Sequence, residues 1–451
     1  MATEGNHVVA IVGGSTAGAE VAAALSARGV ETVVFEQNDR PYGKIEDGLP
    51  RWHVALRRKE YATISSKLAR PHVHFVPRTK LGRDLDFEDV ARRWGFTGVV
   101  LAIGAWRDRP LPIPGADAYV DRGLVYQNAF IYWFNHFVEK GYSGPVYEVP
   151  DGTIVVGGGL ASIDVVKVLQ LEMTCRALKA RGIEESLVSM EVRGIPDALA
   201  THGLTWEDLD LQGCTLYYRR RAEDMPLVEI SPGLDEARVA KLGVARRKIL
   251  EKATRKYLFR IETNLAPKDL IVQGERLVGL VFQRTRIEGG KVLEVPGETI
   301  QVRGPLVISS IGSIPETIEE IPMKGELFRY ADWNVGRLEG YEDVFGAGNV
   351  VTGKGNIVAS RKHGAEVATF VIERFLGLDG SHEGEEALTE PGHEAARAAG
   401  KAIAAEIVRR PTLPADEVRR ILARVRERQI QVGYEGDYHA WIKRVTPADL
   451  V

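Results

Sequence analysis

The chain of 451 residues is about three times as long as an average domain, so two or three folded units are expected rather than one small core. Its composition, 44% hydrophobic and 27% charged, is globular and excludes a disordered, collagenous or low-complexity protein. The formal net charge of -3 provides no general field for nucleic acid or a membrane surface, so we expect neither as a partner.

The cysteine count limits the redox chemistry of the chain. Only Cys175 and Cys214 occur, too few for an iron–sulfur cluster, a Cys-rich zinc site or a disulfide framework, and they form no C-x-x-C pair. The N-terminal residues lack a basic start, the apolar stretch 8–12 is too short for a secretory signal, and no run of about eighteen apolar residues follows. We therefore expect a cytoplasmic protein without a metal site.

Residues 8–36 have the pattern of a strand, a tight turn, a helix and a second strand. The β-branched run VVAIV (8–12) precedes GGSTAG, an Ala-rich helical stretch follows, and the run 32–35 ends in Glu36. Gly13, Ser15 and Gly18 stand where a dinucleotide fingerprint needs small residues, and Glu36 stands where an acid accepts the ribose hydroxyls. This spacing predicts a nucleotide-binding βαβ unit.

A nucleophile elbow is the competing interpretation of the same turn. That elbow requires glycine at position 17, where this chain has Ala17, and no acid and histidine follow in a recognisable order. It would also leave Glu36 without a role. The turn therefore favours nucleotide binding over hydrolase chemistry.

A second signature of the same kind begins at residue 153. The run TIVV (153–156) precedes GGGLAS and a helical stretch, and the later strand 215–218 ends in three arginines, 219–221. Gly157, Gly159 and Ser162 supply this turn, and arginine in place of an acid suits a nucleotide that carries a 2′-phosphate. The expected nucleotide is NADP(H). The alternative interpretation of the three arginines is that they form an ordinary solvated basic strand end and bind no nucleotide.

Other apolar runs at 98–103, 305–311 and 343–345, each followed by glycine, read as parallel strands buried on both faces. The long interval before the arginines predicts a helical insertion at about 171–210. The alternating stretch 265–303 predicts a small antiparallel excursion.

The C-terminal part changes character at about residue 380. A polar linker is expected at 381–392, followed by an Ala-rich segment that ends at Pro411. Apolar residues at 418, 421, 422 and 425 then predict a helix after Pro414. Tyr434, Tyr438 and Trp441 are expected to anchor this appendage to its own body or to another subunit.

Seven segments of the chain resemble, in order, the adrenodoxin-reductase and glutamate-synthase small-subunit group of flavoproteins. They are GGSTAG with Glu36, PYGKIEDGLP, VVLAIGAWRDRPLPIPG, VVGGGLASID, YYRRRAEDMP, VISSIGSIP and VFGAGNVVTGKGNI, within residues 8–375. The resemblance implies an α/β fold with two Rossmann-like nucleotide-binding domains and a C-terminal helical extension. The FAD domain would occupy residues 1–115 and 321–380, the inserted NADP domain 116–320 and the extension 381–451.

The resemblance also implies cofactor-binding residues. FAD would be held by Gly13, Ser15, Gly18, Glu36, Gly43 in the loop 41–50, Ala102, Gly104, Gly348, Asn349, Gly355, Asn356 and Ile357. NADP would use Gly157, Gly159, Ala161, Arg219 and Arg220. Asn349, Leu160 and Lys44 depart from the family pattern, and the cysteines that hold iron–sulfur clusters in glutamate-synthase small subunits are missing.

The expected activity is hydride transfer between the nicotinamide C4 and the flavin N5, with no catalytic acid or nucleophile. The expected partner is a ferredoxin or an iron–sulfur subunit, in a hetero-oligomer through the C-terminal extension, for example within a 2-oxoacid oxidoreductase. Basic residues at 246–256 are the expected docking patch for an acidic ferredoxin, or an ordinary solvated helix face. The alternatives are an NADPH-dependent flavoenzyme that reduces a small organic substrate and a nucleotide-sensing scaffold.

Overall fold

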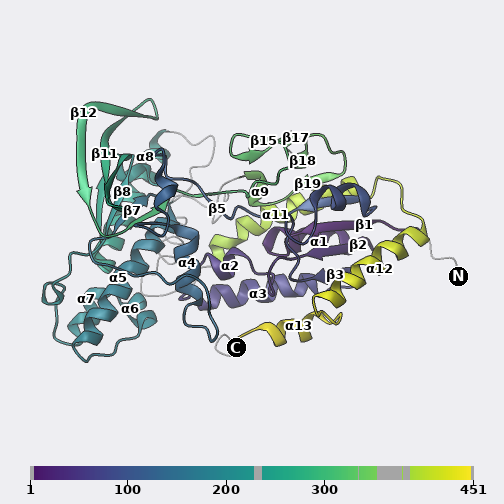
Figure 1. Ribbon diagram of the computed structural model, residues 1–451, viewed down its shortest axis with the longest axis horizontal. Helices are drawn as coiled ribbons and strands as arrows, with labels where there is room; N and C mark the ends of the chain where they lie inside the picture. Colours follow the sequence, from purple (N-terminus) through teal and green to yellow (C-terminus); the bar gives the residue numbers. More distant parts are fainter. Residues whose placement is uncertain (1–4, 228–235, 334, 353–377, 379–385, 448–451) are drawn as a thin grey trace.

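The computed structural model describes residues 5–227, 236–333, 335–352, 378 and 386–447. Two parallel sheets lie at opposite ends of the elongated molecule, and a third, antiparallel sheet extends beside one of them (Figure 1). This arrangement is the predicted α/β class.

The first sheet has seven strands in the order β17-β18-β19-β4-β1-β2-β3. Strands β19, β4, β1, β2 and β3 run parallel, and β17 and β18 form an antiparallel edge. Every residue of β1 is buried, as expected for a strand covered on both faces. The bounds are β1 Val8–Val12, β2 Glu31–Phe35, β3 Val73–Val76, β4 Gly98–Leu101, β17 Tyr330–Asp332, β18 Arg337–Leu338 and β19 Val344–Gly346.

Helices cover both faces of this sheet. One face packs on α1, α3, α11 and α13, and the other packs on the short π-helical turn η1 and on α12. The bounds are α1 Thr16–Ser26, α2 Lys44–Asp47, α3 Val54–Leu68, η1 Asp89–Arg93, α9 Asn349–Thr352, α11 Glu386–Ile407, α12 Ala415–Gln431 and α13 Tyr438–Val445.

The second sheet has five parallel strands in the order β6-β13-β7-β8-β9. The predicted helical insertion is present, because α5 continues to Ala180 and α6, α7 and η3 follow. The bounds are β6 Leu124–Tyr126, α4 Gln127–His136, β7 Ile154–Gly157, α5 Leu160–Ala180, α6 Leu187–Arg193, α7 Ile195–Ala200, η3 Glu207–Leu209, β8 Thr215–Tyr218, η4 Ala222–Asp224, α8 Glu236–Tyr257, β9 Arg260–Thr263 and β13 Val307–Ser310.

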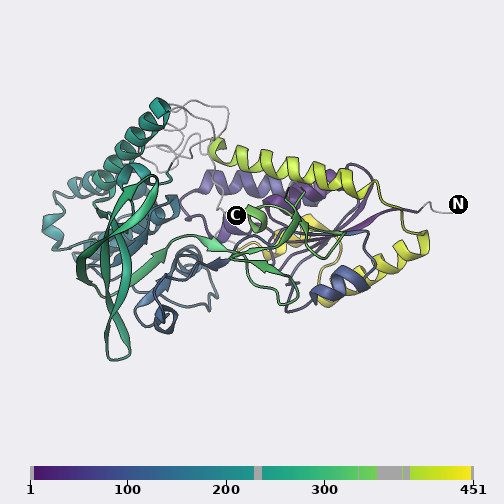
Figure 2. The same ribbon diagram turned by 90° about the horizontal axis from the view of Figure 1, so that it is seen from above.

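The predicted antiparallel excursion is a sheet of three strands, β10 Leu265–Gln273, β11 Arg276–Glu288 and β12 Lys291–Arg303. It is larger than expected, since β11 and β12 each have 13 residues. Their hairpin projects from the body in both views (Figures 1 and 2).

Two short segments connect the two parallel sheets. The chain leaves the first sheet through β5 Arg107–Asp108 and returns through β14 Ser313–Ile314, and these segments pair with each other. The first sheet is thus built from segments before and after the second, as the resemblance implies. The remaining short elements are η2 Ala116–Tyr119, β15 Met323–Lys324 and β16 Leu327–Phe328.

The C-terminal helices pack on the first sheet. The expected linker at 381–392 is partly wrong, because α11 begins at Glu386 and continues through Pro391. The long contact of α11 with α1, where Gly400 packs on the backbone of Glu20 and Val21, outweighs the one backbone hydrogen bond that proline removes. Within the described residues, no helix is long and apolar enough to span a membrane.

The aromatic residues of the tail are buried within the same chain. Tyr434 and Tyr438 pack edge-on against Phe75 of β3, with ring centroids 5.7 and 5.2 Å away. Trp441 donates its indole N–H to the carbonyl of Asp39 at 2.7 Å. Anchoring to the chain's own body is therefore the correct one of the two interpretations for these three side chains.

Candidate functional site

The first glycine turn leaves space for backbone only. Gly13 has a φ of +100°, and a Cβ atom there would lie 2.5 Å from the carbonyl oxygen of Ala102. A Cβ atom on Gly18 would lie 1.8 Å from the carbonyl oxygen of Gly13, so α1 packs directly on the end of β1. The unpaired N–H groups at the start of α1 make this turn suitable for an anion.

Glu36 is tied to this turn from the end of the neighbouring strand. Its carboxylate accepts the backbone N–H of Gly14 at 2.8 Å and that of Asn38 at 3.0 Å. Burial raises the pKa of Glu36 to about 7, although both backbone N–H groups act in the opposite direction. A carboxylate has about four acceptor positions, so Glu36 keeps capacity to accept a ligand hydroxyl.

A cavity of about 800 Å³ opens at this turn. Gly13, Ser15, Glu36, Gly43 and Ala102 all line it, so the structure gathers five of the predicted residues around one space. Because the cavity lies where β1, β2 and β4 end, it occupies the usual ligand position of a doubly wound sheet.

The other residues predicted for the first site have different positions. Gly18 and Gly104 do not line the cavity. Gly348 lies against α1, since a Cβ atom there would be 2.7 Å from the Cβ of Ala17, and Asn349 begins α9. Gly355, Asn356 and Ile357 lie outside the described residues.

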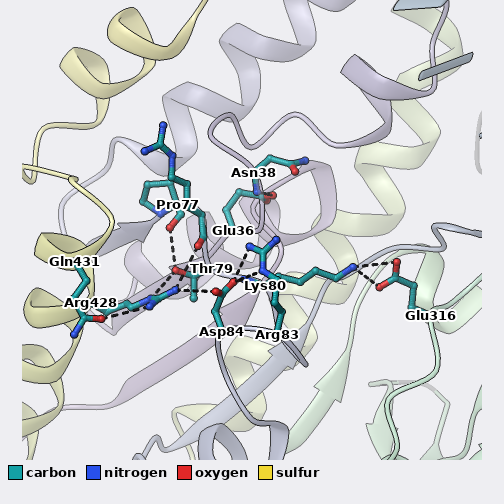
Figure 3. Close-up of polar contacts among 11 residues, drawn as sticks. Glu36, Asn38, Pro77, Thr79, Lys80, Arg83, Asp84, Glu316, Arg428 and Gln431 are labelled. Atoms are coloured by element: carbon teal, nitrogen blue, oxygen red, sulfur yellow. Dashed lines mark hydrogen bonds and ion pairs between the residues drawn. The ribbon is translucent and has the colours of Figure 1, made fainter. Parts of the chain in front are cut away.

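A loop that the sequence did not reveal forms one wall of the cavity. Residues 79–87, which follow β3, all line it. Lys80 of this loop pairs at 2.9 Å with Glu316, which also lines the cavity (Figure 3). No local sequence pattern marks this loop, because its position depends on contacts with distant segments.

The second glycine turn has the same construction at the end of β7. A Cβ atom on Gly157 would lie 2.5 Å from the carbonyl oxygen of Ser310, whereas one on Gly159 would meet nothing within 4 Å. Gly159 is the N-cap of the 21-residue helix α5, and Ala161 is exposed in its first turn. The helix therefore presents open N–H groups beside a position that a ligand can approach closely.

The three arginines after β8 have different surroundings. Arg221 pairs with Asp224 at 2.8 Å, and Arg220 donates to the carbonyl of Gly290 at 2.9 Å. Arg219 is exposed, and no polar partner of its side chain occurs among the described residues. Of the three, Arg219 is the guanidinium best placed to receive an added anion.

Lys44 connects the first cavity to the second sheet. It follows Gly43, and its ammonium donates to Ser313 Oγ at 3.0 Å and to Asn128 Oδ1 at 3.3 Å. Asn128 lies in the first turn of α4, directly after β6. Burial lowers the pKa of Lys44 to about 8, although the charge of Asp108 opposes this shift. The sequence marked Lys44 only as a departure from a family pattern.

The basic stretch on α8 is only partly available as a docking patch. Arg246 is buried and donates to the carbonyl of Glu223 at 3.2 Å, and Lys256 donates to the carbonyl of Val192 at 2.6 Å. Arg247, Lys248, Lys252 and Arg255 are exposed. The expected docking patch at 246–256 is therefore wrong for Arg246, which is buried, and for Lys256, which is half-buried.

The described residues contain no group of three or more His, Cys, Asp or Glu side chains arranged to hold a metal ion. His72 and His74 both bind the carboxylate of Glu31, at 2.9 and 2.7 Å.

Comparison with characterised proteins identifies relatives of the chain. Cindoxin reductase of Citrobacter braakii is 31% identical over 164 residues, 36% of this chain and 34% of that protein. The glutamate synthase [NADPH] small chain of Mycobacterium tuberculosis is 29% identical over 164 residues, and the mitochondrial NADPH:adrenodoxin oxidoreductase of Arabidopsis thaliana is 26% identical over 167 residues. These alignments cover 35% and 36% of this chain and 32% of each relative, so the chain spans about a third of the length of the proteins it matches.

FprA of Mycobacterium tuberculosis, solved in complex with NADPH, shares the fold. It aligns with a TM-score of 0.58 at 17% identity over 94% of this chain and 91% of its own. No family model matches the chain. The relatives confirm the predicted resemblance to the adrenodoxin-reductase and glutamate-synthase small-chain group.

Proposed function

We propose that this relative of the adrenodoxin-reductase and glutamate-synthase small-chain flavoproteins binds FAD in the 800 Å³ cavity and NADP(H) at the second glycine turn. It then transfers electrons between NADP(H) and an iron–sulfur partner such as a ferredoxin. In this proposal residues 1–115 and 321–380 hold FAD, and residues 116–320 hold NADP(H). The observation that carries it is the contact network that joins the two glycine turns at one junction.

The donors and acceptors around the first cavity suit a dinucleotide. The N-terminus of α1 offers N–H groups to a pyrophosphate, and Gly13 lets it approach the backbone. Glu36 keeps acceptor positions for the hydroxyls of the adenosine ribose. Gly348 lies against the same helix end, so Asn349 is a further candidate for binding the cofactor.

The second turn suits a phosphorylated dinucleotide. The open Gly159 and Ala161 lie at the start of α5, where the helix dipole favours a pyrophosphate. Arg219 is free to form a charge-assisted pair with a 2′-phosphate, and Arg220 could join it by leaving Gly290. NADP(H) is therefore proposed rather than NAD(H).

A continuous series of contacts connects the two sites. Gly43 lines the first cavity, and Lys44 beside it binds Asn128 and Ser313. The residue before Asn128, Gln127, accepts a hydrogen bond from Ser310 at 2.7 Å, and the carbonyl of Ser310 touches the second glycine turn. Two cofactors whose reacting ends meet at this junction would face each other.

The chemistry of such a pair belongs mainly to the cofactors. A bound flavin takes up two electrons as hydride and releases them singly, which suits an iron–sulfur acceptor. The residues of this chain bind and orient the cofactors, and Lys44 supplies a buried positive charge at the junction. The proposal therefore assigns no catalytic acid or nucleophile.

The partner should be acidic if it docks on the exposed basic residues of α8, Arg247, Lys248, Lys252 and Arg255. We also propose that the C-terminal extension joins this chain to a partner in a hetero-oligomer. Tyr434, Tyr438 and Trp441 already pack against residues of this chain. Exposed residues of α12 and α13 would have to make that contact.

The test is NADPH-driven reduction of a bacterial ferredoxin by the purified, FAD-loaded protein under anaerobic conditions. The expected result is ferredoxin reduction that needs both the protein and NADPH and that decreases as salt screens the docking charges. Flavin reduction by NADPH without electron transfer to any iron–sulfur protein would contradict the proposed partner class.

One observation favours a second candidate function, the reduction of a small organic molecule. A separate cavity of about 440 Å³, lined by Arg107, Asp108, Tyr126 and Tyr147 among others, borders the junction at β5. A quinone or aldehyde that oxidises the reduced protein much faster than ferredoxin does would support this alternative.

A further inference from the structure

We propose that Arg428 of the C-terminal helix α12 is a positioning residue for FAD, because it fixes the loop that forms the adenosine-side wall of the cavity. This inference rests on the proposed function, since it takes FAD as the occupant of that cavity. It gives the C-terminal extension a role within this chain, in addition to any role in docking.

The loop in question, residues 78–87, begins where β3 ends, next to Glu36. Thr79 donates its backbone N–H to the carbonyl of Glu36 at 2.7 Å, and Arg78 donates to the carbonyl of Asn38 at 3.2 Å. Residues 79–87 then line the cavity. Because Glu36 is the expected acceptor for the adenosine ribose, this loop faces the adenosine half of the ligand.

The loop begins with a strained residue. Arg78 has a φ of +52°, in the left-handed region that residues other than glycine rarely adopt because it is sterically strained. Such a conformation persists only where the surroundings hold it. The guanidinium of Arg78 forms an ion pair with Asp39 and lies over the ring of Trp441, with 5.2 Å between the guanidinium carbon and the ring centroid.

Arg428 of α12 also contacts this segment, and Figure 3 shows its guanidinium beside Thr79 and Asp84. Its guanidinium donates to the carbonyl of Arg78 at 3.4 Å and to Thr79 Oγ1 at 3.1 Å, and it pairs with the carboxylate of Asp84 at 3.5 Å. One side chain therefore contacts the strained residue, the next residue and Asp84 further along the loop. A planar fork of donors suits this geometry, and lysine does not supply it.

Asp84 links the Arg428 contact to the rest of the loop. It accepts the backbone N–H of Lys80 at 2.8 Å and the guanidinium of Arg83 at 2.7 Å. Partial burial acts to raise the pKa of Asp84, but Arg83, the Lys80 N–H and the charge of Arg428 together hold it below its usual value. The loop is thus closed by a carboxylate whose charge Arg428 helps to stabilise.

The helix that carries Arg428 is itself firmly seated. Ile421 and Val425 of α12 are 1% exposed in the core of the first sheet, and Gln429 donates to the carbonyl of Phe75 at 2.9 Å. Arg428 is therefore held by a rigid element, and its removal should loosen the loop rather than the helix.

The experiment compares FAD binding by the full-length chain and its Arg428→Ala and Arg428→Lys variants after removal of the flavin. Arg420→Ala is the matched control, because Arg420 is on the same helix, its side chain is 73% exposed, and it forms an ion pair with Glu417 of that helix. Flavin fluorescence gives the Kd for FAD, and hydrogen exchange follows residues 78–87.

The expected result is a Kd about tenfold higher in Arg428→Ala, an intermediate Kd in Arg428→Lys, and faster exchange in the loop, with Arg420→Ala unchanged. Equal FAD affinity in Arg428→Ala and Arg420→Ala would overturn the inference, even if the melting temperature fell. If Arg428→Ala does not fold, Thr79→Val removes one Arg428 contact together with the hydrogen bond from the Thr79 hydroxyl to the carbonyl of Pro77, and unchanged affinity there would also overturn the inference. A wild-type chain that does not bind FAD would refute the proposed function instead.

Discussion

The ammonium of Lys44 lies 3.0 Å from the hydroxyl of Ser313, although 269 positions separate the two residues in the sequence. Lys44 follows the cavity-lining Gly43, and Ser313 begins the strand by which the chain returns from the second sheet. This contact places a buried positive charge where the two proposed cofactors would meet.

Lys44→Met should make flavin reduction less favourable, because a nearby cation stabilises the negative charge that reduction adds. We expect the midpoint potential to fall by about 30 mV, which is tenfold for a two-electron couple. Lys44→Arg is the control that keeps the charge. Spectroelectrochemistry of the three proteins provides the measurement, and an identical potential in Lys44→Met would show that the charge does not reach the flavin.

Alanine substitutions of the two glycines at the second turn should have different effects on protein stability. Gly157→Ala forces a Cβ atom to 2.5 Å from a backbone oxygen, so we expect about 2 kcal/mol or more of lost stability. Gly159→Ala meets nothing within 4 Å and should retain wild-type stability. Chemical denaturation measures both, and equal stability of the two variants would contradict the described packing.

The arginines after β8 should contribute unequally to NADPH affinity. Arg219→Ala should weaken NADPH binding by about 1–3 kcal/mol and leave NADH almost unchanged, as expected for loss of a charge-assisted bond to a phosphate. Arg221→Ala is the matched control, because Arg221 already pairs with Asp224. Isothermal titration calorimetry with both nucleotides checks this, and an equal loss for NADPH and NADH would mean that Arg219 does not read the 2′-phosphate.

FAD affinity should depend on pH through Glu36. Without ligand the pKa of Glu36 is about 7, and hydroxyl groups that donate to the carboxylate favour its charged form and lower this pKa. Affinity should therefore be highest above pH 7 and fall by up to about tenfold for each pH unit below it. Titrations between about pH 6 and pH 8 measure the slope, and the same slope in Glu36→Gln would assign it to another group.

Features of the fold and the site that depend on the spacing of nearby residues could be predicted from the sequence. Gly13, Gly18 and Glu36 lie within one βαβ unit, where backbone geometry fixes their positions: both glycines pack at the junction of β1 and α1, and Glu36 follows β2 and binds the same turn. The helix at 415–431 followed from its apolar periodicity in the same way.

Features that depend on distant contacts could not be predicted. Arg428 reaches Thr79 across 349 positions, and Lys44 reaches Ser313 across 269. A polar side chain gives no sign in the sequence of which distant loop it will bind. The linker predicted at 381–392 was partly wrong for a related reason. Packing on α1 extends helix α11 through Pro391, although proline usually ends a helix.

Two facing dinucleotide sites should bring NADPH to a bound flavin. The most direct measurement is anaerobic mixing of the FAD-loaded protein with NADPH and, separately, with NADH, while the visible absorbance of the flavin is recorded. We expect NADPH to bleach the flavin rapidly and at much lower concentration than NADH. A folded, colourless protein that takes up no FAD, or a bound flavin that stays yellow in NADPH, would contradict it.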